Sequence, residues 1–128
     1  MTREEAIRKV TREWGNARFS YGYFDCCQLA KDVFKAYRGF DPAPDLIYDD
    51  EEQAREIIKE YGDLEGLLIH ILGEPVPVEE TDTADIVLLE WPGQEPTAGV
   101  RVPDGGLVPI ARGVDKMPLR YILKGWRI

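Results

Sequence analysis

Four segments in the first part of the chain carry apolar residues at the spacing of one helical face. The apolar stripes are Ile7, Val10 and Trp14; Cys26, Leu29, Ala30, Val33, Phe34 and Tyr37; Ala54, Ile57, Ile58 and Tyr61; and Leu64, Leu67, Leu68, Ile71 and Leu72. A residue suited to cap a helix N-terminus precedes each stripe, namely Thr2, Asp25, Asp49 or Asp50, and Asp63. A glycine follows each stripe, at Gly15, Gly39, Gly62 and Gly73. The pattern therefore predicts four helices before residue 74.

The pattern changes after residue 74, where apolar residues gather in short runs that turn residues separate. Residues 86–89 form a continuous apolar run, which is typical of a buried central strand. Residues 98–102 and 107–110 are predicted to form two more strands joined by a turn at 103–106, and a last strand is expected between Leu119 and Ile128. Helices followed by antiparallel strands indicate the α+β class. We expect a single domain, residues 1–128, with N-terminal helices packed on a short C-terminal antiparallel β-sheet.

Two adjacent cysteines, Cys26 and Cys27, begin the second predicted helix directly after its capping residue Asp25. Cys26 belongs to the apolar stripe and to the first turn, where the positive end of the helix dipole favours a thiolate. This position suits a cysteine nucleophile. It also suits a small buried core residue, and the pattern leaves both interpretations open.

Acidic residues outnumber basic ones by 24 to 16, which gives a formal net charge of −8. Nucleic acid is therefore not an expected partner, because phosphate binding needs a basic surface, and adhesion to anionic lipid is not expected either. No apolar run approaches the ~20 residues of a membrane-spanning helix, and the acidic N-terminus does not resemble a signal peptide. We expect synthesis in the cytoplasm, no membrane insertion, free thiols, and neither a cofactor nor a metal.

Two clusters of side chains allow more than one interpretation. The acidic run 49–52 suits a hard cation or a helix N-terminus, and the helix is favoured because a calcium loop spaces its ligands with glycine. The aromatic residues Phe19, Tyr21, Tyr23 and Phe24 form either a binding surface or a layer packed over the start of the second helix.

Three segments share a pattern with a known superfamily. They are Tyr21-Gly22-Tyr23-Phe24-Asp25-Cys26, Ala84-Asp85-Ile86-Val87-Leu88 and Gly125-Trp126-Arg127-Ile128. In this order they resemble the NlpC/P60 superfamily of papain-like cysteine peptidases, and within it a small phage-associated branch. That branch pairs a Trp-Gly-x-x-Asp-Cys-type helix start with a Gly-Asp-Val-Val-Leu-type strand and ends in a Trp-Arg-Ile-like strand. The resemblance extends from the first predicted helix to residue 128 and implies an NlpC/P60-like fold.

The resemblance assigns roles to two residues and leaves one role empty. It places Cys26 at the nucleophile and Tyr21 at a tyrosine that helps to shape the oxyanion site. The superfamily's catalytic histidine opens the second strand in a His-Val-Gly-Ile-type motif, where this chain has Thr97-Ala98-Gly99-Val100. The polar residue that orients this histidine has no counterpart in Leu107-Val108-Pro109-Ile110. Ala84 also stands where the branch has glycine.

The single histidine of the chain, His70, is the remaining candidate for a base. It lies on the fourth predicted helix but off the apolar stripe, so we expect it on the surface. It would need to reach within ~3 Å of the Cys26 sulfur to act as a base.

Without a base, the resemblance implies a structural protein more readily than an enzyme. We expect a tail-tip or tail-assembly protein of a bacteriophage or phage-like particle, with a degenerate and inactive NlpC/P60 fold, made in the host cytoplasm and present in the virion. Its partners would be other tail proteins, namely the hub and the central fibre or tip proteins. The alternative is an active cell-wall cysteine peptidase or amidase that attacks peptidoglycan through Cys26, with His70 or a partner residue as base. A third possibility is a cytosolic chaperone of tail assembly.

Overall fold

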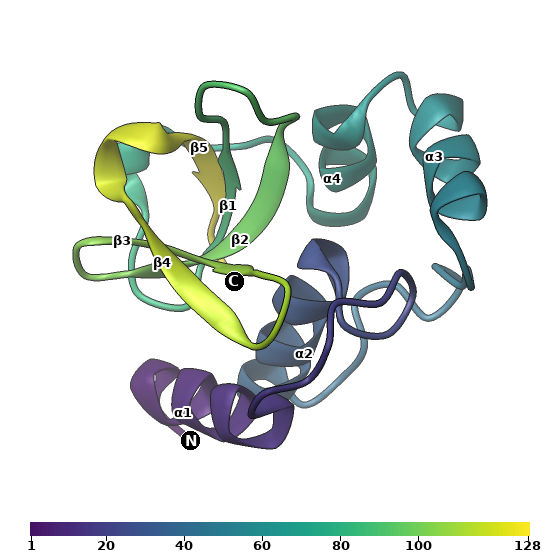
Figure 1. The fold of residues 1–128 in the computed structure, drawn as a ribbon. Coiled ribbons are helices and arrows are strands. Elements are labelled where there is room, and N and C mark those ends of the chain that lie inside the picture. The colour runs from purple at the N-terminus through teal and green to yellow at the C-terminus, as the bar shows by residue number, and fades with distance from the viewer.

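The helices precede the strands along the chain in the computed structural model, which describes residues 1–128 (Figure 1). The four α-helices are α1 (Arg3–Trp14), α2 (Cys26–Arg38), α3 (Glu51–Glu60) and α4 (Leu64–Leu72). The five strands are β1 (Ile86–Leu89), β2 (Thr97–Val102), β3 (Gly105–Pro109), β4 (Val114–Pro118) and β5 (Ile122–Trp126), and two short 3₁₀ turns are η1 (Val78–Glu80) and η2 (Leu119–Tyr121). The fold is of the α+β class. None of its helices has the length and apolar character needed to cross a bilayer.

The helix boundaries follow from side-chain caps. Thr2, Asp25, Asp50 and Asp63 each accept a hydrogen bond from the backbone N–H three residues later, which satisfies a donor that the first helical turn leaves free. Of the two candidates for the third helix, Asp50 is the cap. Helix α2 ends at Gly39 in the left-handed conformation. The four predicted helices are confirmed.

The sheet has the order β4-β3-β2-β1-β5, and all neighbouring strands are antiparallel. Strand β1 lies between β2 and β5 and is buried at every position. The prediction of a buried internal strand at residues 86–89 is therefore confirmed.

The sequence pattern did not indicate β4 and placed the start of β3 too late. Strand β4 is at an edge of the sheet with Asp115 and Lys116 exposed, so it lacks the apolar run of an internal strand. Gly105 and Gly106 belong to β3 instead of the predicted turn. A Cβ atom at Gly105 would lie 2.2 Å from the Met117 carbonyl oxygen, so glycine permits the close pairing of β3 with β4.

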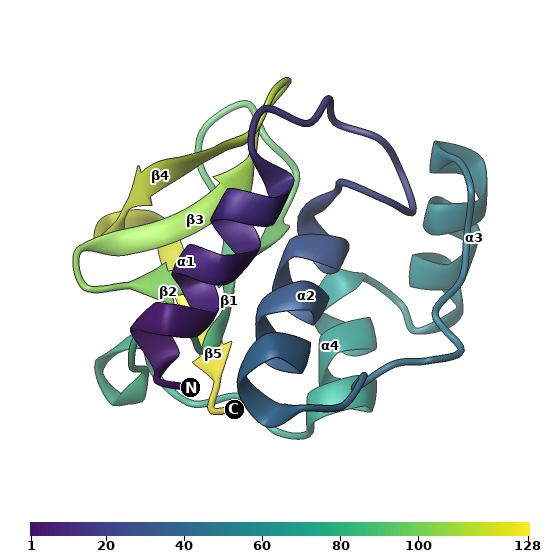
Figure 2. The ribbon, with the colours of Figure 1, turned by 90° about the horizontal axis from the view of Figure 1, so that it is seen from below.

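Helices α1 and α2 lie next to each other against one face of the sheet (Figure 2). Helix α4 packs beside the sheet as well, and α3 is the outermost helix (Figure 1). One buried cluster between these layers comes from α2, α4 and the strands β1, β2 and β5; it contains Ala30, Phe34, Leu64, Leu67, Leu68, Ile86, Leu88, Ala98 and Trp126. A second cluster joins α1 and α2 to β2 and contains Ala6, Val10, Trp14, Leu29, Val33, Ala84 and Val100. A smaller cluster of Val87, Leu89, Val108 and Ile122 fills the other face of the sheet. The N-terminal helices thus pack on the C-terminal sheet, as predicted.

A fully buried carboxylate, Asp85, joins the first helix to the last residues of the chain. Its Oδ1 accepts a hydrogen bond from Arg3 Nη1 at 2.7 Å, and its Oδ2 forms an ion pair with Arg127 Nε at 2.9 Å. The carboxylate also accepts the backbone N–H groups of Ile128 at 3.0 Å and Asp82 at 2.8 Å. Three hydrogen-bond donors and the Arg127 guanidinium therefore compensate the charge that burial would otherwise make unfavourable. We call this group the Asp85 clamp.

The residue before Asp85 has an uncommon backbone conformation. Ala84 has φ +74° and is the only non-glycine residue of the chain with positive φ. An alanine in this conformation costs about 1–2 kcal/mol relative to the usual right-handed region. Glycine, which the resemblance expects here, would adopt it freely.

Candidate functional site

The start of α2 is held by the carboxylate of Asp25, which is 3% exposed. Its Oδ1 accepts the Gln28 backbone N–H at 2.9 Å. Its Oδ2 accepts the Gly22 N–H at 2.7 Å and the Tyr48 hydroxyl at 2.7 Å. One carboxylate therefore fixes the helix start to the loop before α2 and to the loop after it. The sequence predicted the cap but not the two other bonds.

Gly22 permits this arrangement by its lack of a side chain. It has φ +87°, and a Cβ atom would lie 2.0 Å from the Tyr48 carbonyl oxygen. The buried Tyr48 gave no sequence signal, because it lies in a loop that carries no periodic pattern. Only the folded structure shows that this loop lies over the start of α2 and that Tyr48 binds Asp25.

The thiols of Cys26 and Cys27 are half-buried and contact each other in the first turn of α2. A hydrogen bond from the Cys27 thiol holds the pKa of the Cys26 thiol below its ordinary value, and the backbone of Ala98 and of Cys27 acts in the same direction. Burial and the Asp25 carboxylate oppose this effect. The same bond, together with burial, raises the pKa of the Cys27 thiol well above its ordinary value. Cys26 is therefore the thiol of the pair that ionises first.

Both thiols line a cleft of about 850 Å³ between the helices and one end of the sheet. The cleft walls come from the start of α2, the inner side of α3, the start of α4, and the segment between β1 and β2. Its lining includes Phe19, Tyr21, Cys26, Cys27, Arg55, Ile58, Lys59, Leu88, Glu90, Trp91, Glu95, Thr97, Pro109 and Leu123. Aromatic, aliphatic and charged side chains thus surround a potential nucleophile.

Tyr21 lies in the same cleft as Cys26, and the structure brings these two predicted residues together. The Tyr21 ring packs edge-to-face on Phe19, with 5.0 Å between ring centroids. Burial and the neighbouring Glu51 carboxylate raise the pKa of the Tyr21 hydroxyl. The hydroxyl therefore stays protonated at neutral pH and can donate a hydrogen bond.

His70 does not join this site. It is exposed on α4 and stacks on Tyr61, with 4.5 Å between ring centroids, and it is not among the residues that line the cleft. Thr97 opens β2 where the resemblance expects a histidine, and it lines the cleft. Its hydroxyl donates to the Glu95 carbonyl oxygen at 3.1 Å and cannot act as a base. The cleft therefore contains no imidazole.

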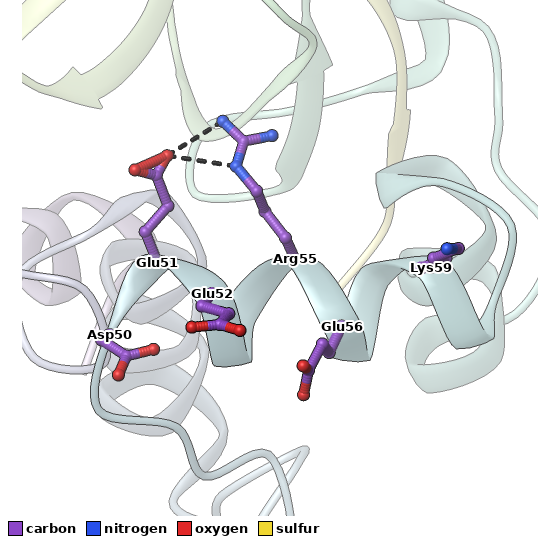
Figure 3. A pocket seen from close by; sticks show the side chains of 6 residues that line it. All are labelled: Asp50, Glu51, Glu52, Arg55, Glu56 and Lys59. Atoms are coloured by element: carbon purple, nitrogen blue, oxygen red, sulfur yellow. Dashed lines mark hydrogen bonds and ion pairs between the residues drawn. The ribbon is translucent and has the colours of Figure 1, made fainter.

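An ion pair joins α3 to the segment between β1 and β2 and was not predicted. Arg55 on α3 lies 3.0 Å from Glu51 and 3.3 Å from Glu95 in the segment between β1 and β2. Figure 3 shows Glu51 and Arg55 on the same side of α3. Their spacing of four residues was a visible signal for a helical ion pair, whereas Glu95 is 40 residues away and gave none.

Residues of the acidic run at the start of α3 accept hydrogen bonds from within the chain. Asp50 caps the helix by accepting the Gln53 N–H at 2.8 Å, and Asp49 accepts the Tyr23 hydroxyl at 2.8 Å. Glu52 lies on the side of α3 opposite to the side chains of Glu51 and Arg55 (Figure 3). No three histidine, cysteine or acidic side chains of the chain converge as metal ligands.

The fold and the site define an α+β protein with a cysteine pair at a helix N-terminus that faces a cleft. The whole chain, residues 1–128, matches the family described as Domain of unknown function (DUF6950), and the protein belongs to this family. The comparison with curated proteins gives no match.

Proposed function

We propose that this protein is a non-catalytic NlpC/P60-like protein that serves as a structural component of a phage tail tip or of its assembly. One observation carries the non-catalytic part of the proposal: no imidazole lies in the cleft that contains Cys26. The tail part is supported by the resemblance of the three segments that contain Cys26, Asp85 and Trp126. The hub and the central fibre or tip proteins are the proposed partners.

Hydrolysis of an amide needs more than a thiolate. After the sulfur attacks, the leaving amine must receive a proton, and a base must later activate water. Tyr21 is a poor proton donor because its pKa is raised, and Thr97 has no acidic proton in the neutral range. Loss of the base alone lowers the rate of triad enzymes by several orders of magnitude.

A second candidate function is an active peptidoglycan peptidase or amidase with Cys26 as nucleophile. The observations in its favour are the lowered pKa of Cys26 and the presence of Tyr21 in the same cleft. Its base would have to come from His70 after a large movement of α4, or from a partner chain.

The pH dependence of Cys26 alkylation distinguishes the two candidates. With iodoacetamide, and with mass spectrometry to follow each cysteine, we expect the Cys26 rate to fall about tenfold per pH unit below its pKa, because only the thiolate reacts. A cysteine–histidine ion pair would instead sustain a plateau to about pH 5. His70→Ala is the matched control and should give the same profile as the wild type. A plateau that His70→Ala removes would contradict the non-catalytic proposal.

Substitution of the cysteine tests the structural role. In the phage or host that carries the gene, Cys26→Ala should leave particle assembly intact or mildly weakened, because a small apolar residue can occupy the same half-buried place. The protein should be detectable by mass spectrometry in purified particles, and wild type and Cys26→Ala should release no soluble fragments from purified peptidoglycan. Loss of infectivity with normal particle assembly would support the enzyme instead.

A further inference from the structure

The turn between β3 and β4 places one arginine directly opposite another. Arg18 and Arg112 form an isolated antiparallel bridge, which is held by backbone hydrogen bonds between segments 17–19 and 111–113. Both arginines are exposed, and neither takes part in an ion pair. Like charges in directly opposite positions repel each other, so this pair lacks a counter-charge within the chain. Ile110 in the same turn is 43% exposed, and we call Arg18, Ile110 and Arg112 the arginine face.

A second exposed cluster has the opposite charge and contains two apolar side chains. Ile47 and Tyr23 are 75% and 57% exposed, and Asp49 accepts the Tyr23 hydroxyl at 2.8 Å. Figure 3 shows Asp50 and Glu52 on the same side of α3. The exposed carboxylates beside Ile47 along the chain take part in no ion pair; they are Asp45, Asp49, Asp50 and Glu52. We call Tyr23, Ile47 and these four carboxylates the acidic face.

The two faces are neighbours because one short segment joins them. Arg18 and Tyr23 are five residues apart, and five residues of extended chain span at most about 18 Å. Gly22 in this segment lies against the backbone of Tyr48, which follows Ile47 of the acidic face. The loop between α1 and α2 reaches from the end of α1 toward the loop that precedes α3 (Figure 1). A two-fold axis through this loop can therefore place the arginine face of each copy against the acidic face of the other.

From this arrangement we infer that the chain forms a two-fold dimer through these two faces. Arg18 and Arg112 of one copy meet carboxylates of the other that have no cation of their own, so the contact relieves repulsion on both sides. Ile47, Tyr23 and Ile110 supply apolar surface that becomes buried, while the charges select the partner. A second copy is the partner because the chain itself carries the complementary surface. The dimer does not depend on the proposed phage-tail function, which concerns other partners.

Sedimentation velocity of the full chain tests the dimer. At about 0.05 M NaCl we expect a concentration-dependent dimer, and its dissociation constant should rise at least about tenfold at about 0.5 M NaCl, because salt screens exposed charges. Two charge-reversed variants test the pairing: Arg18→Glu with Arg112→Glu, and Asp45→Arg with Glu52→Arg. Each variant should be monomeric alone, because like charges then face each other in both contacts. An equimolar mixture of the two variants should restore the dimer.

Matched controls separate this contact from general charge effects. Both variants stay net negative, since two acid-to-arginine substitutions do not offset a wild-type charge of −8, so nonspecific attraction does not explain a restored dimer. Glu79→Arg with Glu80→Arg makes the same charge change on exposed residues outside both faces and should leave the dimer intact. Ile47→Ser should weaken the dimer at least about tenfold, because its side chain is buried in the contact. Leu119→Ser, at a residue 38% exposed beyond the far end of β4, should have no effect.

Three outcomes would overturn the inference. The first is a wild type that stays monomeric at about 1 mM, where even a weak dimer is populated. The second is a dimer that both variants retain alone, because association would then use another surface. The third is a mixture that stays monomeric although circular dichroism shows both variants folded; Arg18→Gln with Arg112→Gln, which should weaken the dimer, replaces a reversed variant that does not fold. None of these results alters the Cys26 alkylation profile that tests the non-catalytic proposal.

Discussion

Replacement of Asp85 by alanine is expected to lower the free energy of unfolding by about 3–5 kcal/mol, as is typical when one partner of a buried ion pair is removed. Asp85 is fully buried, accepts hydrogen bonds from Arg3 and two backbone N–H groups, and forms an ion pair with Arg127. The substitution would leave these N–H groups without their acceptor, and it would leave the Arg3 guanidinium, whose side chain is 17% exposed, without its carboxylate partner. Urea unfolding followed by tryptophan fluorescence measures the change.

The matched control for the Asp85 clamp is Asp104→Ala. Asp104 also pairs with a cation, Lys116, but both side chains are exposed, so this substitution should leave stability unchanged within error. If Asp85→Ala unfolds at the same urea concentration as Asp104→Ala, the clamp does not stabilise the fold.

Gly22→Ala is expected to cost about 3 kcal/mol of stability, from two separate effects. The left-handed conformation costs an alanine about 1–2 kcal/mol, and steric overlap in a packed region costs about 1–3 kcal/mol. The overlap is with the Tyr48 carbonyl oxygen, 2.0 Å from the new Cβ atom. Relief of this overlap would move the Tyr48 loop away from Asp25. The same urea titration measures the loss.

Gly62→Ala separates these two effects. Gly62 has φ +92°, but a Cβ atom there has no neighbour within 4 Å. Only the conformational cost of about 1–2 kcal/mol should remain. Equal losses for Gly22→Ala and Gly62→Ala would mean that the loops over the start of α2 adjust without cost.

The helices could be predicted from the sequence because their signals are local. Each of the caps Asp25, Asp50 and Asp63 lies directly before its helix, and the apolar stripe of that helix repeats within a few residues. Strand β4 could not be predicted, because an edge strand with exposed charges has no apolar alternation. The local pattern therefore predicted the elements that carry an apolar stripe or run, including the edge strand β5, and missed the charged edge strand β4.

The candidate site was only partly visible in the sequence. Cys26 and Tyr21, five residues apart, lie in one cleft, and His70 lies outside it. The roles that the resemblance gives to Cys26 and Tyr21 stay predictions. Tyr48 and Glu95 were missed because each reaches the site from a loop far along the chain, and no local pattern encodes such contacts.

The Asp85 clamp has a consequence for the order of folding. Arg3 Nη2 donates to the Ile128 carbonyl oxygen at 2.9 Å across a separation of 125 residues. Contacts between distant residues form slowly, because closing a long loop has a high entropic cost until intervening elements shorten it. The contacts between α1 and α2 and between neighbouring strands can form earlier, since these elements are nearer to one another along the chain. We therefore expect the clamp to form late in folding, so that it lowers the unfolding rate more than it raises the folding rate.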